Sequence, residues 1–102
     1  MTVLRWLPSA RDDVQAILRF IAGHDAAAAT RWAGRIHAAA HRAAEMPLSG
    51  RRIPELGRDN ARETIVGNYR LLYGIRGAEV HVFAVIHGRR ILPPDIEPSN
   101  DP

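Results

Sequence analysis

The sequence predicts an α+β fold in the order β-α-α-β-β-β, with a helical hairpin packed on a mostly antiparallel four-stranded sheet. Two patterns predict this class. Apolar side chains recur at helical spacing through residues 10–46, and a short break around Gly23 divides the stretch into two antiparallel helices. Residues 62–90 show the two-residue alternation of pleated strands, with two tight reversals. A chain of 102 residues holds a single core, so we expect one domain over residues 1–92.

The first predicted elements are a strand and a helix. Residues 2–7, T-V-L-R-W-L, form a short apolar run that ends before a proline. Ser9 offers an N-cap for a helix over residues 10–22, and Asp12 and Asp13 would complement the helix dipole in its first turn. Gly23 is expected at the C′ position, where glycine commonly takes a left-handed conformation.

The second predicted helix begins after Asp25, a candidate cap, and ends at Pro47. Its apolar side is rich in alanine. Small side chains allow close approach but bury little apolar area each, so both helices should depend on the sheet for stability. The apolar stripe consists of Ala29, Trp32, Ala33, Ile36, Ala40 and Ala43.

The three-stranded meander follows a long connection over residues 47–60 that is rich in Pro, Gly and Arg. Gly67 and Asn68 form a two-residue hairpin signal, because Gly tolerates the positive φ of a type II′ turn. A second reversal is expected at residues 76–79. The last strand is apolar on both sides, which predicts an interior position. Strict alternation places Val80, Val82, Ala84 and Ile86 on one face and His81, Phe83, Val85 and His87 on the other.

The end of the chain and its composition narrow the class of protein. Residues 93–102 contain all four prolines that follow the meander, and we expect this tail to be disordered. The chain has no cysteine and no apolar run that approaches a membrane span, so we expect a cytoplasmic protein. All 14 basic residues are arginine and the net charge is +3, which favours an anionic partner, either an acidic protein segment or nucleic acid.

One pattern resembles a metal site. His37 and His41 are one helical turn apart, and Glu45 follows one turn later. The glutamate that a zinc-protease helix places directly after its first histidine is missing, and no third ligand is evident. We therefore interpret these residues as a solvated helix flank and expect neither a metal nor a cofactor.

The charged residues around the meander suggest a second kind of site. Cleavage of RNA through its 2′-hydroxyl needs a base, cations for the phosphorane and an acid for the leaving oxygen. Residues of these types are Glu55, Arg62, Arg70 and His87. The alternative is that Glu63 pairs with Arg62 or Arg70 across strands and that His87 merely ends a strand.

Four segments resemble the RelE/ParE superfamily of type II toxins, and the ParE-like branch in particular. They are W-L-P-S-A-R-D-D-V-Q-A-I-L-R-F-I, G-R-R-I-P-E-L, R-E-T-I-V-G-N-Y-R-L-L-Y and V-I-H-G-R-R, and together they span roughly positions 5 to 90. The resemblance implies a toxin of a plasmid-stabilisation-like module and an antitoxin whose acidic C-terminal segment wraps and neutralises it. The groove over the Ala-rich helices and the sheet edge is where the anchors of that segment are expected.

The resemblance also implies two possible mechanisms. RelE-like members cleave messenger RNA in the ribosome, as metal-independent ribonucleases, whereas ParE-like members inhibit DNA gyrase and are not enzymes. Glu55, Arg70 and His87 match a ribonuclease pattern, but Gly88 stands where that pattern has tyrosine, and the H-G-R-R ending is similar to ParE-type members. A family member that only binds its antitoxin is a third possibility. The residues expected to contact the antitoxin or the target are Arg62, Arg70, Tyr73, His87, Arg89, Arg90, Trp32 and Ile36.

Overall fold

A computed structural model of the chain describes residues 2–90 and 92. The strands are β1 (Val3–Trp6), β2 (Arg51–Arg52), β3 (Ala61–Val66), β4 (Tyr69–Arg76) and β5 (Glu79–His87), and the helices are α1 (Pro8–Ala22) and α2 (Ala26–Glu45). A single 3-10 turn, Pro47–Ser49, follows α2. The predictions for the tail at residues 93–102 lie outside the described residues.

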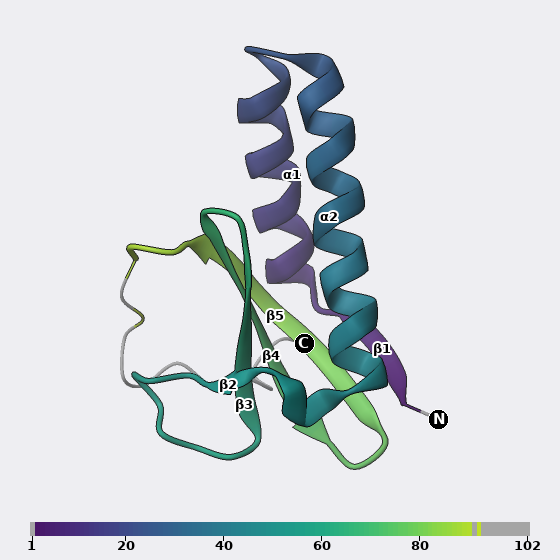
Figure 1. Cartoon of the computed structure of the whole chain (residues 1–102), viewed down its shortest axis with the longest axis vertical. Helices are drawn as coiled ribbons and strands as arrows, with labels where there is room; N and C mark the ends of the chain where they lie inside the picture. The colour runs from purple at the N-terminus through teal and green to yellow at the C-terminus, as the bar shows by residue number, and fades with distance from the viewer. Residues whose placement is uncertain (1, 91, 93–102) are drawn as a thin grey trace.

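The sheet has five strands in the order β1-β5-β4-β3-β2, and only β1 pairs in the parallel direction (Figure 1). The α+β class and the helical hairpin are confirmed, but the prediction of four strands is wrong. The additional strand is β2, which lies in the segment expected to be a loop and pairs with β3 through Arg51–Glu63 and Arg52–Arg62. Two residues are too short a run to show a periodicity, so no pattern in the sequence marked this strand.

The helical hairpin covers one face of the sheet and projects beyond it (Figure 1). The buried residues of α1 lie near its beginning and those of α2 near its end, so the connection between the helices stands away from the sheet. The buried residues of this first core are Ala10, Val14, Ile36, Ala39, Ala40, Ala43, Ala44, Val66, Leu71, Tyr73, Val80, Val82 and Val85. Six of the seven residues that the helices contribute to this core are alanine or valine, consistent with a close approach of the helices to the sheet.

The opposite face of the sheet carries a second, smaller core. The segment after β2 covers part of it through Ile53, and Leu92 also packs there. Its buried residues are Ile53, Ala61, Leu72, Phe83, Ala84, Ile86 and Leu92.

A β-bulge in β5 changes the predicted faces of that strand. Leu72 pairs with Ala84 and Tyr73 with Val82, so Phe83 has no partner in the register. Beyond this point Val85 faces the helices while Ala84 and Ile86 join the second core. The predicted alternation holds through Phe83 and is wrong from Ala84 on, because a bulge adds one residue to one strand and shifts every later side chain to the other face. The interior position of β5, between β1 and β4, is confirmed.

Side chains of α1 satisfy the backbone groups near the bulge. The Ser9 hydroxyl donates to the carbonyl oxygen of Phe83 at 2.8 Å, and an Asp13 carboxylate oxygen accepts from the Val85 amide at 3.0 Å. The prediction that Ser9 caps α1 is therefore wrong, since the helix begins at Pro8 after Leu7. These two contacts fix the helix on the sheet where the strand is irregular.

The predictions for the other helix ends and for the turns are confirmed at some residues and wrong at others. Asp25 caps α2 by accepting from the Ala28 amide at 3.1 Å, as predicted. Helix α1 ends at Ala22 as predicted, but Gly23 is its C-cap residue, with a right-handed φ of −62°, and not the predicted C′ residue. Gly67 and Gly77 have φ of +59° and +55°, whereas no described residue other than glycine has a positive φ. A positive φ at Gly67 but not at Asn68 fits the predicted type II′ turn.

Candidate functional site

Four charged side chains meet on the second face of the sheet, and we refer to Arg51, Glu55, Glu63 and Arg70 as the acid–arginine cluster. Glu63 and Arg70 lie on the adjacent strands β3 and β4, and Glu55 reaches them from the loop after β2. The side chains of Glu63, Arg70 and Glu55 are 0%, 6% and 16% exposed. Arg51 closes the cluster from the solvent side by donating to Glu63. The interpretation that Glu63 pairs with Arg70 across strands is confirmed.

All five N–H donors of Arg70 are used within this cluster and its surroundings. Nε donates to Glu63 at 2.8 Å, and the two Nη atoms donate to the two oxygens of Glu55 at 2.9 and 2.8 Å. Nη1 also donates to the carbonyl oxygen of Arg90 at 2.8 Å, and Nη2 contacts Glu63. A guanidinium has five donors and no acceptor, so Arg70 has no donor left for a phosphate or a partner's carboxylate in this conformation.

The electrostatics follow from this pairing. The hydrogen bonds from Arg70 lower the pKa of Glu55 to about 2, against desolvation, which acts in the opposite direction. The same contact raises the pKa of Arg70, so the pair is fully ionised at neutral pH. A carboxylate with a pKa of about 2 is a poor general base, because efficient proton transfer at pH 7 needs a pKa close to 7.

His87 lies on the other face of the sheet from Arg70. Its ring packs edge-on against Tyr69, with centroids 6.0 Å apart, and Tyr69 in turn packs edge-on against Trp32 at 5.4 Å. The Arg35 guanidinium lies 4.3 Å from the centre of the Trp32 ring. We call Trp32, Tyr69 and His87 the aromatic row; it joins α2 to the ends of β4 and β5, and its histidine is exposed to solvent.

The remaining predicted site residues have different positions. Arg89 and Arg90 are exposed directly after β5. Arg62 donates to backbone oxygens of Asp59 and Gly50 at 2.9 and 3.0 Å and thereby braces the connection that precedes β3. The predicted set is therefore divided between two faces of the sheet and does not converge on one site.

Tyr73 and Ile36 are fully buried, so their side chains are not available to a partner in this structure. The Tyr73 hydroxyl donates to the Pro47 carbonyl oxygen at 2.7 Å and accepts from the Gly50 amide at 3.2 Å. Burial raises the pKa of Tyr73, so it remains a neutral donor. Both residues stabilise the first core and the turn after α2.

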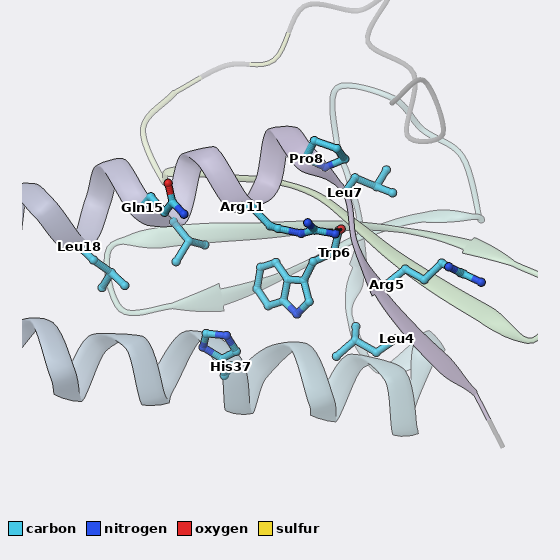
Figure 2. Close-up of a pocket in the computed structure, with 10 residues that line it drawn as sticks. Leu4, Arg5, Trp6, Leu7, Pro8, Arg11, Gln15, Leu18 and His37 are labelled. Atoms are coloured by element: carbon cyan, nitrogen blue, oxygen red, sulfur yellow. Dashed lines mark hydrogen bonds between the residues drawn. The ribbon is translucent and has the colours of Figure 1, made fainter. Parts of the chain in front are cut away.

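A groove of about 740 Å³ lies where β1 meets the two helices. Figure 2 shows Trp6 of β1 between the two helices, with His37 beside it on α2 and Leu18 farther along α1. The Trp6 and His37 ring centroids are 5.3 Å apart. The lining residues are Leu4, Arg5, Trp6, Leu7, Pro8, Arg11, Val14, Gln15, Leu18 and His37.

The lining of the groove is mostly apolar and includes two arginines. The Arg11 guanidinium is held by two hydrogen bonds to the carbonyl oxygen of Trp6, at 3.2 and 2.9 Å. Arg5 pairs with Glu79 at 3.1 Å on the outer side of β1. Sequence reasoning expected a groove at the helices and the sheet edge but did not name these residues. The alternation of Leu4 and Trp6 in the first strand was the signal that could have identified them.

The predicted helix flank with two histidines does not gather ligands. His37 Nδ1 donates to the carbonyl oxygen of Ala33 at 2.8 Å, and His41 is exposed. Within residues 2–90 and 92, no three His, Asp or Glu side chains are grouped so that they could hold a metal ion. Over the same residues, neither helix is long and apolar enough to cross a bilayer.

Comparison with known families identifies the fold and the class of protein. Residues 4–92 match the family model of the ParE toxin of the type II toxin–antitoxin system parDE. The chain belongs to the ParE toxin family. This match covers every described strand and helix except the first residue of β1.

A solved structure of the chromosomal ParDE toxin–antitoxin system from P. aeruginosa has the same fold as this ParE family member. The two chains superimpose with a TM-score of 0.72 at 16% sequence identity, over 85% of this chain and 96% of the other. None of the curated proteins compared with the chain matches it. The resemblance inferred from the four sequence segments is thus confirmed at the level of the family.

Proposed function

We propose that this ParE family member acts in the cytoplasm as a toxin that inhibits DNA gyrase by direct binding, and that a cognate acidic antitoxin neutralises it. The observation that carries the proposal is the separation of the ribonuclease-like residues. Glu55 and Arg70 pair with each other on the second face of the sheet, whereas His87 contacts Tyr69 on the face that bears the helices.

RNA cleavage would need these groups around one phosphate. A general acid and a general base must both lie within hydrogen-bond reach of the reacting atoms, and a free cation must meet the phosphorane. Here Arg70 has no free donor, and the carboxylate of Glu55 is a weak base. These facts favour inhibition by binding over catalysis.

The groove supports an acidic antitoxin segment as the neutralising partner. Its apolar lining, which includes Trp6, Leu18 and Val14, suits apolar anchors, and Arg5 and Arg11 are also part of the lining. Residues 2–92 contain all 14 arginines but only eight of the 11 acidic residues. An excess of cations on the folded body attracts an acidic segment over long range and raises its rate of association.

The proposal is tested with purified DNA gyrase in a supercoiling assay. We expect inhibition by the protein, relief of inhibition by the cognate antitoxin, and at least a tenfold weaker effect of the R89A/R90A double variant. Arg76 provides a matched control, since it is also exposed but lies at the opposite end of β4, and R76A should inhibit like the parent protein.

Two other outcomes would replace the proposal. Cleavage of ribosome-bound message, lost in R70A or H87A, together with unaffected gyrase, would establish the ribonuclease. No response in either assay, together with tight antitoxin binding, would establish a family member that only binds its antitoxin.

The two tryptophans allow the two surfaces to be distinguished. Trp6 lies in the groove and Trp32 in the aromatic row, so W32F and W6F each leave one fluorescent reporter. We expect the antitoxin to change the emission of Trp6 in W32F. An antitoxin that changes only Trp32, in W6F, would move its binding site from the groove to the aromatic row.

A further inference from the structure

Hydrogen bonds hold the backbone of the segment that follows β5, and in one of them the Arg89 amide donates to His87 Nδ1 at 3.3 Å. The Gly88 amide donates to the Asn68 carbonyl oxygen at 2.7 Å, and the Arg90 amide donates to the His87 carbonyl oxygen at 2.9 Å. The Arg90 carbonyl oxygen accepts from Arg70 at 2.8 Å, and the Leu92 amide donates to Glu55 at 3.0 Å. The last two bonds come from the acid–arginine cluster.

The ion pair of Glu55 and Arg70 therefore binds two backbone groups, the carbonyl oxygen of Arg90 and the amide of Leu92. Glu55 uses one oxygen, Oε2, both for Arg70 Nη1 and for the Leu92 amide. The Leu92 side chain is buried in the second core, so apolar packing also holds this residue on the sheet. Between these anchors, the side chains of Arg89 and Arg90 are exposed.

The two arginines have charge available for a partner. No described residue forms an ion pair with Arg89 or Arg90, whereas Arg70 and Arg51 are paired within the cluster. A guanidinium on a fixed backbone loses less conformational entropy on binding than one on a free chain end, which increases its contribution to affinity. The function of the buried ion pair would then be to hold the backbone that carries the unpaired guanidinium groups of Arg89 and Arg90.

We propose that Glu55 and Arg70 are positioning residues, which clamp the backbone at Arg90 and Leu92 and so present Arg89 and Arg90 to the target of the toxin. The clamp itself is independent of what the target is. Its role in inhibition rests on the proposed function above. Neither Glu55 nor Arg70 touches the target in this proposal.

The experiment measures the clamp and the inhibition separately in the full chain. E55Q removes the negative charge and replaces one carboxylate oxygen by an NH2 donor. In the orientation that keeps an oxygen at the Oε2 position, this donor faces Arg70 Nη2, so one hydrogen bond and the ion pair that hold Glu55 in place are lost. We expect hydrogen exchange at the Leu92 amide to become at least tenfold faster, while amides in the centre of β4 stay protected. Gyrase inhibition should weaken at least tenfold, and affinity for the antitoxin should stay within twofold, because the groove is formed by other elements.

E79Q is the matched control, since Glu79 is also paired with a cation but lies on β5 away from the chain end. It should leave the exchange of Leu92 and the inhibition unchanged. If E55Q does not fold, E55D, which keeps the charge but shortens the reach, provides the same comparison.

Each result has a defined meaning. Unchanged exchange at Leu92 in E55Q would overturn the clamp, and faster exchange with full inhibition would overturn its positioning role. Equal loss of inhibition and antitoxin affinity would indicate a general structural role and would also overturn it. A parent protein that does not inhibit gyrase would refute the proposed function, and the exchange measurement would still decide whether the clamp exists.

Discussion

Replacement of Arg70 by methionine should destabilise the protein strongly at neutral pH. The variant keeps an unbranched side chain of similar length but removes the charge that Glu55 and Glu63 share. Glu63 is 0% exposed and would keep only its contact with Arg51, whose own side chain is 63% exposed. Removal of one partner from a buried ion pair costs about 3–5 kcal/mol, because the remaining charge stays desolvated.

The pKa of Glu55 gives a second estimate of the stability that Arg70 contributes. It lies at about 2 instead of 4.5 in the folded protein, a difference that corresponds to about 3 kcal/mol. Because the folded-state pKa is lowered, this stabilisation is fully present above pH 4.5 and is lost as the pH falls towards 2. The two values agree in magnitude, and either value is a large fraction of the about 5–15 kcal/mol by which domains are usually stable.

Urea denaturation at pH 7, 5 and 3 provides the measurement. The parent protein should lose stability between pH 5 and 3, whereas R70M should lose less or gain, since its unpaired carboxylates become neutral. The difference between the two proteins should therefore shrink as the pH falls. A difference that is the same at all three pH values would refute the electrostatic explanation and assign the loss to packing.

Two further variants complete the test of Arg70. R5M removes the cation of an exposed pair with Glu79 and should have a much smaller effect, because solvent screens that pair. The triple variant E55Q/E63Q/R70M leaves no buried charge unpaired and should recover part of the stability that R70M loses.

Three other substitutions test local features of the fold. G67A should destabilise the protein by about 1–3 kcal/mol, because Gly67 has φ +59° and an added Cβ would collide with the Trp32 ring. Thermal or urea unfolding measures this loss, and unchanged stability would contradict the packing. G34A, at a helical position where an added Cβ meets nothing within 4 Å, should instead stabilise by about 0.5–1 kcal/mol, and a loss of stability would show that Gly34 has a contact not evident here. D25A should cost about 1 kcal/mol of stability and lower the helical circular dichroism signal, and an unchanged stability would contradict the role of this cap.

The features that could be predicted from the sequence are those that one short segment determines. Asp25 caps its helix through an amide three residues away, and Gly67 supplies the positive φ that its turn requires. Both need only local geometry. The helical hairpin follows in the same way from two amphipathic stretches with a connection too short for any other arrangement.

The features that escaped prediction depend on partners far away in the sequence. Serine is a common N-cap residue, but Ser9 donates to the carbonyl oxygen of Phe83, which is 74 residues later. The strand at Arg51–Arg52 exists because β3 lies beside it. The three-way contact among Glu55, Glu63 and Arg70 spans a loop and two strands, so residue types suggested a site while only the fold showed that the charges neutralise each other.

The bulge at Phe83 connects these findings with the proposed function. Val80 and Val82 face the helices, so strict alternation from them would have placed His87 on the second face, the face of Arg70. The additional residue returns His87 to the helix side, where it meets Tyr69, and leaves Ile86 opposite Arg70. One inserted residue in a strand thus separates a histidine from the Glu–Arg pair that RNA cleavage would require beside it. Because the bulge is held by Ser9 and Asp13 of α1, the separation is a property of the packed fold and not of the strand alone.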